Sequence, residues 1–249
     1  MNIFEDFSSP SINTNIWQAS IKAGSSITIE NGWCRIRQFS GWAGAALQTR
    51  EKMSPQELFK NITAEFDMYM FGMNYNQNGA SINPFIGFVN PASPRGFHYN
   101  DTSNHMNLIM QVHQTFFRFV HKGAGNHNYI SVGRDSITSV VGNGSQNRIK
   151  IECNNYDLKI YVNGAEQMNL LITEQMMNRI GNLCHVEFYL GNYQPGNSMY
   201  INNVSIKTSP LQILNFKTDF NNNYLVSASV LHSEDSKIKK KLFVNDILV

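Results

Sequence analysis

Residues 147–164, NRIKIECNNYDLKIYVNG, alternate between apolar and polar side chains along almost their whole length. Successive side chains of a β-strand point to opposite faces, so each half of this stretch predicts a strand with one buried face. Asn154-Asn155 in the middle predicts the turn of a hairpin, and Asn163-Gly164 predicts the next turn, because both pairs tolerate left-handed backbone. The residues expected to face the core are Ile149, Ile151, Cys153, Leu158, Ile160 and Val162.

The same period of two recurs along most of the chain. It is most regular in residues 61–71, and two alternating segments in residues 25–37 flank Asn31-Gly32, a strong hairpin signal. Residues 170–180, LLITEQMMNRI, are the main helix candidate, with Gly181 to cap its end, and residues 55–59 predict a helical turn. Further strands are expected at residues 45–50, 85–89, 105–113, 116–121, 129–133, 185–190 and 199–206.

Composition and charge exclude several classes of protein. Hydrophobic residues make up 42% of the chain, enough for a core, while only 15% are charged and the formal net charge is +2. A net charge this small does not indicate the basic surface that nucleic-acid binding requires. No apolar stretch approaches the ~20 residues that span a membrane, and the N-terminal stretch lacks the pattern of a signal peptide, so synthesis in the cytoplasm is expected. The odd, irregularly spaced cysteines, Cys34, Cys153 and Cys184, are expected to be buried thiols rather than disulfides or zinc ligands.

Three segments resemble concanavalin A-like lectin and glucanase domains, the laminin-G-type jelly rolls. They are the opening IFEDFSSPSINTNIW, the hairpin of residues 147–164, and MYINNVSI at residues 199–206, which resembles the strand that closes such domains. The resemblance implies an all-β, two-sheet antiparallel jelly-roll sandwich over residues 1–208. The same fold serves lectins, glycosidases, lyases and structural modules, so it does not decide the function.

Ser209-Pro210 predicts a domain boundary, after which residues 209–249 form a small β-rich C-terminal appendage. A segment this short buries little apolar surface alone, so it is expected to dock on the main domain or on another chain. An uncovered strand edge would pair with a partner, which favours an assembly role and an oligomer. The alternative is a simple extension of the sandwich.

Aromatic and polar residues gather in the expected loops. Sugars are bound by rings that stack on their C–H faces and by polar groups that bond their hydroxyls. Asp101, with Asn100 and Asn104, could bind calcium through oxygen atoms, and no other cofactor is expected. The alternative is that these rings fix the loops to the sandwich or anchor a protein partner. The predicted ligand-binding residues are Trp42, Tyr75, Arg95, Phe97, Tyr99, Asp101 and Tyr193.

Two groups of residues each resemble part of a catalytic or metal-binding site, but neither group is complete. Glu65 and Asp67 share a strand face, as paired carboxylates of glycosidases do. Laminarinase-type hydrolases of the resembled fold use E-x-D-x-x-E or E-x-D-x-E on a related strand, but here Tyr69 and Met70 stand where the second glutamate would be. His105, His113 and His121 recur every eight residues, yet a hairpin turn between them opposes convergence on a metal. No catalytic or metal-binding residue is therefore assigned.

These observations favour a non-catalytic carbohydrate-recognition or adhesion module that binds a glycan or cell-surface polysaccharide through loops at one rim. It would belong to a larger assembly, such as a phage particle, with other virion proteins or its own copies as partners through residues 209–249. Release without secretion would bring it to a virion or an extracellular surface. The alternatives are a purely structural virion protein, such as a capsid decoration or tail component, and a glycan-cleaving enzyme.

Overall fold

The structure is a computed structural model of the chain. It describes residues 1–41, 43–71, 83–89, 105–111, 116–122, 129–136, 146–192, 196–208, 217–219, 225–227, 243–244 and 247–248. The chain divides into two compact units, Met1–Thr208 and Ser209–Val249.

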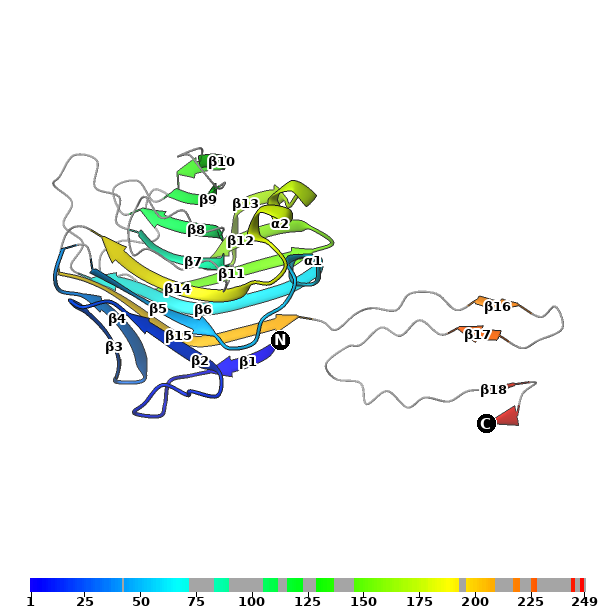
Figure 1. The fold of residues 1–249 in the computed structure, drawn as a ribbon, viewed down its shortest axis with the longest axis horizontal. Helices are drawn as coiled ribbons and strands as arrows, with labels where there is room; N and C mark the ends of the chain where they lie inside the picture. Colours follow the sequence, from blue (N-terminus) through cyan, green and yellow to red (C-terminus); the bar gives the residue numbers. More distant parts are fainter. Residues whose placement is uncertain are drawn as a thin grey trace. The chain divides into compact units, whose positions relative to one another are not determined.

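The larger unit consists of two antiparallel sheets packed face to face (Figure 1). This confirms the predicted all-β, two-sheet jelly roll. Among the described residues, the eight-stranded sheet has the order β13 (Ala165–Leu171), β12 (Asp157–Val162), β11 (Asn147–Asn154), β6 (Asn61–Phe71), β15 (Asn197–Thr208), β4 (Trp33–Gln38) and β3 (Ser25–Glu30), with β1 (Asn2–Glu5) also paired to β15. The seven-stranded sheet, again within the described residues, has the order β10 (Tyr129–Ser136), β9 (Phe116–Lys122), β8 (His105–Gln111), β7 (Asn83–Val89), β14 (His185–Asn192), β5 (Ala43–Thr49) and β2 (Trp17–Ile21).

The core lies between the two sheets and follows the alternation of the sequence. Every second side chain of β6, from Ile62 to Met70, is buried, and those between them are half-buried. Strands β11 and β12 contribute Ile149, Ile151 and Ile160, each at most 1% exposed. Burial of one such side chain stabilises the fold by roughly 1.5–3 kcal/mol. The period-two prediction for this hairpin is therefore confirmed.

The turn between β11 and β12 lies one residue later than predicted. Asn154 pairs with Asp157 as the last rung of the ladder, so Asn155 and Tyr156 form the two-residue loop. Their φ angles are 48° and 70°, the left-handed values that a tight hairpin turn requires. Tyr156 accepts this conformation while its side chain packs partly against the core.

The helices begin at capping residues. Helix α1 (Pro55–Lys60) follows Ser54, whose hydroxyl accepts a hydrogen bond from the amide of Glu57 at 3.2 Å, and proline at the first position suits a helix start. Helix α2 (Glu174–Ile180) begins after Thr173. Gly181 caps its end, as expected. The predicted helix start at residue 170 was wrong, because residues 170 and 171 complete strand β13, which pairs with β12.

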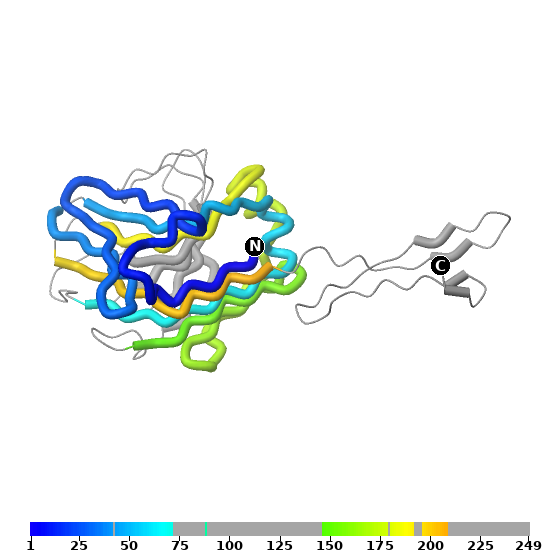
Figure 2. The backbone as a smooth tube through the Cα atoms, turned by 90° about the horizontal axis from the view of Figure 1, so that it is seen from below, coloured from blue at the N-terminus to red at the C-terminus, as the bar shows by residue number. Residues whose placement is uncertain are grey.

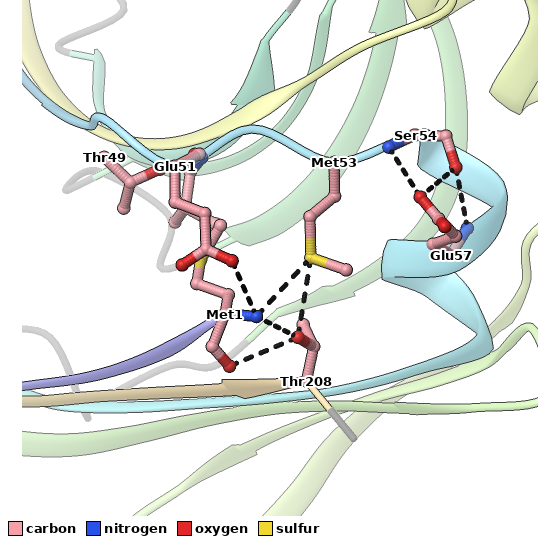
Figure 3. Close-up of polar contacts among 8 residues, drawn as sticks. Met1, Thr49, Glu51, Met53, Ser54, Glu57 and Thr208 are labelled. Carbon is pink, nitrogen blue, oxygen red and sulfur yellow. Dashed lines mark hydrogen bonds and ion pairs between the residues drawn. The ribbon is translucent and has the colours of Figure 1, made fainter. Parts of the chain in front are cut away.

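The start of the chain lies beside the end of the larger unit. Strand β1 pairs with β15, and Figure 2 shows the N-terminal strand running along it. The amino group of Met1 donates a hydrogen bond to Thr208 Oγ1 at 2.6 Å and lies 2.9 Å from the Glu51 carboxylate, with the Met53 sulfur beside it (Figure 3). These contacts join β1, the end of β15 and the segment before α1.

The smaller unit has little regular structure among its described residues. Strand β16 (Lys217–Asp219) pairs with β17 (Leu225–Ser227), and β18 (Phe243–Val244) pairs with β19 (Ile247–Leu248). Two-stranded hairpins are marginally stable alone in water.

Candidate functional site

All the predicted ligand-binding residues lie outside the described part of the chain, but the strands that flank them are described. The flanking strands β8, β7, β14 and β5 are neighbours in the seven-stranded sheet. The affected residues are Trp42, Tyr75, Arg95, Phe97, Tyr99, Asp101 and Tyr193.

The segments that contain the predicted ligand-binding residues join the sheet at two different ends. Asn192 pairs with Ala43, and Gly191 pairs with Asn83, so the connections with Trp42, Tyr75 and Tyr193 attach at one end. Val89 pairs with both His185 and His105, so residues 90–104 connect two strands at the opposite end. A seven-residue strand such as β7 spans about 20 Å. The outward face of the sheet lies between the two sets of attachment points.

Strand β14 presents polar and aromatic side chains on this outward face. Val186, Phe188 and Leu190 belong to the core, so His185 and Glu187, with the residues that follow in the same phase, point to the other side. In Figure 1, β14 is a long curved strand between β7 and β5.

Glu187 is the centre of this group. It is 0% exposed although it faces away from the core between the sheets. The amide of Gln48, on the neighbouring strand β5, donates a hydrogen bond to Glu187 Oε2 at 2.6 Å, because the two residues are paired in the sheet. A carboxylate removed from water needs such donors, since burial of an unpaired charge costs several kcal/mol.

His185 lies beside this carboxylate with hydrogen-bonding capacity to spare. Its side chain is 6% exposed, and its Nε2 atom is 3.5 Å from Glu187 Oε2, an ion-pair distance when the imidazole is protonated. Within the described residues, Nε2 makes no hydrogen bond. Buried polar atoms are almost always paired, so an imidazole nitrogen in this state is suited to a partner that comes from outside.

Tyr189 completes the group and depends on a glycine. Its ring lies over Gly191, two residues along the same face, where an added Cβ would be 1.9 Å from the phenol oxygen. Only a residue without a side chain leaves this space. The face thus combines a carboxylate, an imidazole, an amide and a phenol, which together can donate and accept hydrogen bonds with hydroxyl groups.

Glu65 and Asp67 do share an outward face, but on the opposite sheet and bound to one guanidinium. Arg148 on β11 lies 2.9 Å from Glu65 Oε2 and 3.3 Å from Asp67 Oδ1. Asn203 donates a further hydrogen bond to Asp67 at 2.7 Å. These carboxylates act as cross-strand partners of Arg148, which is a structural role.

The structure offers no metal centre in its described part. No three histidine, cysteine or acidic side chains there are close enough to bind an ion. The calcium hypothesis for Asp101, Asn100 and Asn104 lies outside the described residues, as does His113. The three cysteines are free and buried, as predicted. The described helices include none with the length and hydropathy of a membrane span.

The sequence analysis recognised the strand at residues 185–190 but did not assign its side chains to a site. The only signal was the alternation of His185, Glu187 and Tyr189 with three apolar residues, which any half-solvated strand shows. The burial that distinguishes Glu187 depends on residues far away in the sequence, such as Gln48, which local sequence does not reveal as neighbours.

Comparisons with known proteins bear on the fold. No model of a protein family matches the sequence, and no curated protein matches it. Winged bean acidic lectin in complex with methyl-α-D-galactose superposes with a TM-score of 0.58 at 12% identity, covering 83% of this chain and 98% of the lectin. The Emp46p carbohydrate recognition domain in its metal-free form gives 0.58 at 9% identity, covering 84% and 97%. The endo-β-1,3-glucanase of Pyrococcus furiosus gives 0.55 at 11% identity, covering 82% and 92%.

At these identities the comparisons show the fold, which is the jelly roll of concanavalin A-like lectins and glucanases. This agrees with the family resemblance of the sequence. The neighbours include both binding proteins and a hydrolase, so activity has to be argued from the site.

Proposed function

We propose that the larger unit is a carbohydrate-recognition module that binds a glycan on the outward face of the seven-stranded sheet. The observation that carries this proposal is Glu187, fully buried on that face, 3.5 Å from His185 Nε2, which makes no hydrogen bond within the described residues. The fold supports it, because structures with this fold include a lectin, a carbohydrate recognition domain and a glucanase.

The site suits hydroxylated ligands. Glu187 is 0% exposed, so a ligand reaches its carboxylate by replacing a group that covers it. The carboxylate then accepts a hydrogen bond from a sugar hydroxyl, and Gln48 fixes its orientation by donating to Oε2. His185 Nε2 provides a second polar group 3.5 Å from Glu187 Oε2. The predicted loop residues remain part of the proposal, since their connections begin and end at the two ends of this face.

A glycan array tests the proposal, followed by calorimetry with the best ligand. Wild-type protein is expected to bind, and Glu187→Gln is expected to lower the affinity at least about tenfold, since a charged hydrogen bond contributes about 1.5–3 kcal/mol. Glu152→Gln is the matched control, because Glu152 lies on the opposite sheet with its side chain 39% exposed and pairs with Lys150. Equal binding by Glu187→Gln and wild type, with both folded, would refute the site.

Glycan cleavage is a second candidate function. A buried carboxylate 3.5 Å from an imidazole is an arrangement that can transfer protons. If the protein is an enzyme, the glycan that it binds is shortened, with new reducing ends, and His185→Gln lowers the rate of cleavage by far more than it lowers the affinity. Retained binding without product favours the lectin.

We extend the proposal to assembly. Residues 209–249 would dock the module on copies of itself or on a larger particle, such as a phage virion, where it would act at an outer surface. The two-stranded hairpins described in this unit support docking, because such hairpins need a further packing surface. Mass measurement by light scattering tests this: the full chain is expected to assemble, and residues 1–208 alone are expected to stay monomeric.

A further inference from the structure

The outward face of the eight-stranded sheet carries a second group of aromatic side chains. Three adjacent strands, β6, β15 and β4, form it, and their pairing arranges the residues in rows. Ser198 pairs with both Arg37 and Phe71, and Tyr200 pairs with both Arg35 and Tyr69. Beyond these rows, Trp33 is the next outward residue of β4, and Asn202 pairs with Asp67. We call this group the aromatic patch.

The rings of the aromatic patch are held in place by one another. Tyr69 and Tyr200 stack with their centroids 4.3 Å apart and their planes 7° apart. Trp33 meets Tyr69 edge to face at 5.0 Å and 74°. Pairs of this kind contribute about 0.5–1.5 kcal/mol beyond their buried area. The half-buried rings therefore form a preorganised surface.

The two arginines of the aromatic patch differ in whether a carboxylate pairs with them. The Arg35 guanidinium covers the free side of the Tyr200 ring at 5.3 Å and is neutralised by Glu30 at 3.0 Å. Arg37, one row further, is exposed and has no ion pair among the described residues. Phe71, in the same row, is 58% exposed. One end of the patch thus offers an exposed ring and an exposed guanidinium that has no ion pair within the described part of the chain, although its charge contributes to lowering the pKa of Glu30.

This composition fits a sugar better than a protein surface. Aromatic residues and arginine are also common in protein interfaces, but the fully buried core of an interface is depleted of charge, whereas Arg35, Arg37 and Asp67 stand in these rows and none of the outward positions is aliphatic. Aromatic rings flanked by polar groups match the C–H faces and hydroxyls of a pyranose. Strands lie about 4.8 Å apart and alternate residues about 6.8 Å apart, so three strands and three rows span roughly 10 by 14 Å, enough for a short oligosaccharide.

We propose that the aromatic patch is a second glycan-binding site, selective for acidic oligosaccharides of the uronic acid class. Phe71 and Trp33 provide apolar surface for the sugar rings, and Arg37 binds a carboxylate through its paired N–H groups. The site goes beyond the proposed function, because it lies on the opposite sheet from Glu187 and shares no residue with that site.

Calorimetry with hexamers of galacturonate and mannuronate tests the proposal, with neutral cellohexaose as comparison. The titrations use the full-length Glu187→Gln variant, so that glycan binding at the Glu187 site does not contribute to the signal. The second site is then tested whether or not the first site exists. Saturable binding of at least one acidic hexamer is expected, and it should weaken as salt rises, because an exposed charge pair is screened. Arg37→Gln and Phe71→Ala are each expected to lower the affinity at least about tenfold.

Matched controls remove a charge and a ring elsewhere. Lys52→Gln removes an exposed cation, and Phe4→Ala removes a phenyl ring that is 68% exposed on β1; both should bind like the parent. The proposal is overturned if neither acidic hexamer binds, if cellohexaose binds equally well, or if Arg37→Gln and Phe71→Ala have no effect. Self-association of residues 1–208 that Phe71→Ala abolishes would also overturn it, by identifying the patch as an interface between copies.

Discussion

At the scale of single residues, Glu187 is unusual for a charged side chain because it has no exposed surface, yet it lies on the outward side of a sheet. The Gln48 amide donates a hydrogen bond to this carboxylate, and a carboxylate removed from water needs such donors. Glutamate is seldom fully buried. This is why we place the centre of the proposed function on β14.

Gly191→Ala tests the packing of this site without touching Glu187. The added Cβ would meet the Tyr189 phenol at 1.9 Å, so the ring has to rotate away, while the rigid strand stays in place. We expect both ligand affinity and the thermal midpoint to fall, because the Tyr189 ring is only 6% exposed and has to leave a packed position. Isothermal titration alongside a thermal melt measures both, and unaltered affinity would show that the Tyr189 ring takes no part.

The cysteines give a prediction about pH. Burial raises the pKa of Cys184 from its ordinary 9.0 to about 12, and burial likewise raises that of Cys153 to about 12. The folded thiol keeps its proton where the unfolded thiol loses it, so this contribution to stability is present below pH 9 and is lost as the pH rises from 9 toward 12. Each thiol should lower the free energy of unfolding by about 1.4 kcal/mol per pH unit in that range.

Urea denaturation at pH 8, 9 and 10 measures this effect. Cys184→Ala is the control, because its stability should fall less steeply with pH than that of the wild type. A thiol reagent should modify the cysteines only after unfolding. Parallel pH profiles for the two proteins would contradict the assignment.

At the scale of elements, alternation predicted most strands because each has one face in the core, as β6 shows along its whole length. The errors fell where two local signals competed. Residues 170 and 171 fit a helical spacing, but pairing with β12 places them in β13, and the cap at Thr173 decides where α2 begins. Such pairing depends on partners that local sequence does not specify.

Helix α1 depends on its cap. Ser54 and Glu57 exchange hydrogen bonds at the N-terminus, as Figure 3 shows, and both lie near solvent. Ser54→Ala should therefore cost about 1 kcal/mol of stability, whereas Ser54→Asp should retain most of it, because aspartate also caps. Chemical denaturation of the three proteins measures the difference, and equal midpoints for Ser54→Ala and wild type would refute a role for the cap.

At the scale of the whole molecule, the strand order could not be read from the sequence. Strand β6 lies between β11 and β15, which follow it by many residues, and β14 lies between β5 and β7. The family resemblance predicted the two-sheet jelly roll and periodicity predicted the strands, but neither predicted this order. The candidate site shares the limitation, because Glu187 and Gln48 meet across two strands that are distant in sequence.

We expect the larger unit to have the same thermal stability with and without the smaller unit. The N-terminal amino group bonds Thr208, the last residue of the larger unit, so residues 1–208 contain the contacts that join β1 to β15. A protein truncated after Thr208 should melt at the temperature of the full chain. A clear fall in the melting temperature would indicate that the larger unit needs residues 209–249 for its own stability.

The most direct test of glycan recognition by this jelly roll is to locate the bound ligand. A crystal structure with the oligosaccharide selected on the array should show a sugar on the outward face of β14, with a hydroxyl within hydrogen-bonding distance of the Glu187 carboxylate. A sugar bound only elsewhere, the aromatic patch included, with the surroundings of Glu187 and His185 unchanged, would contradict this claim.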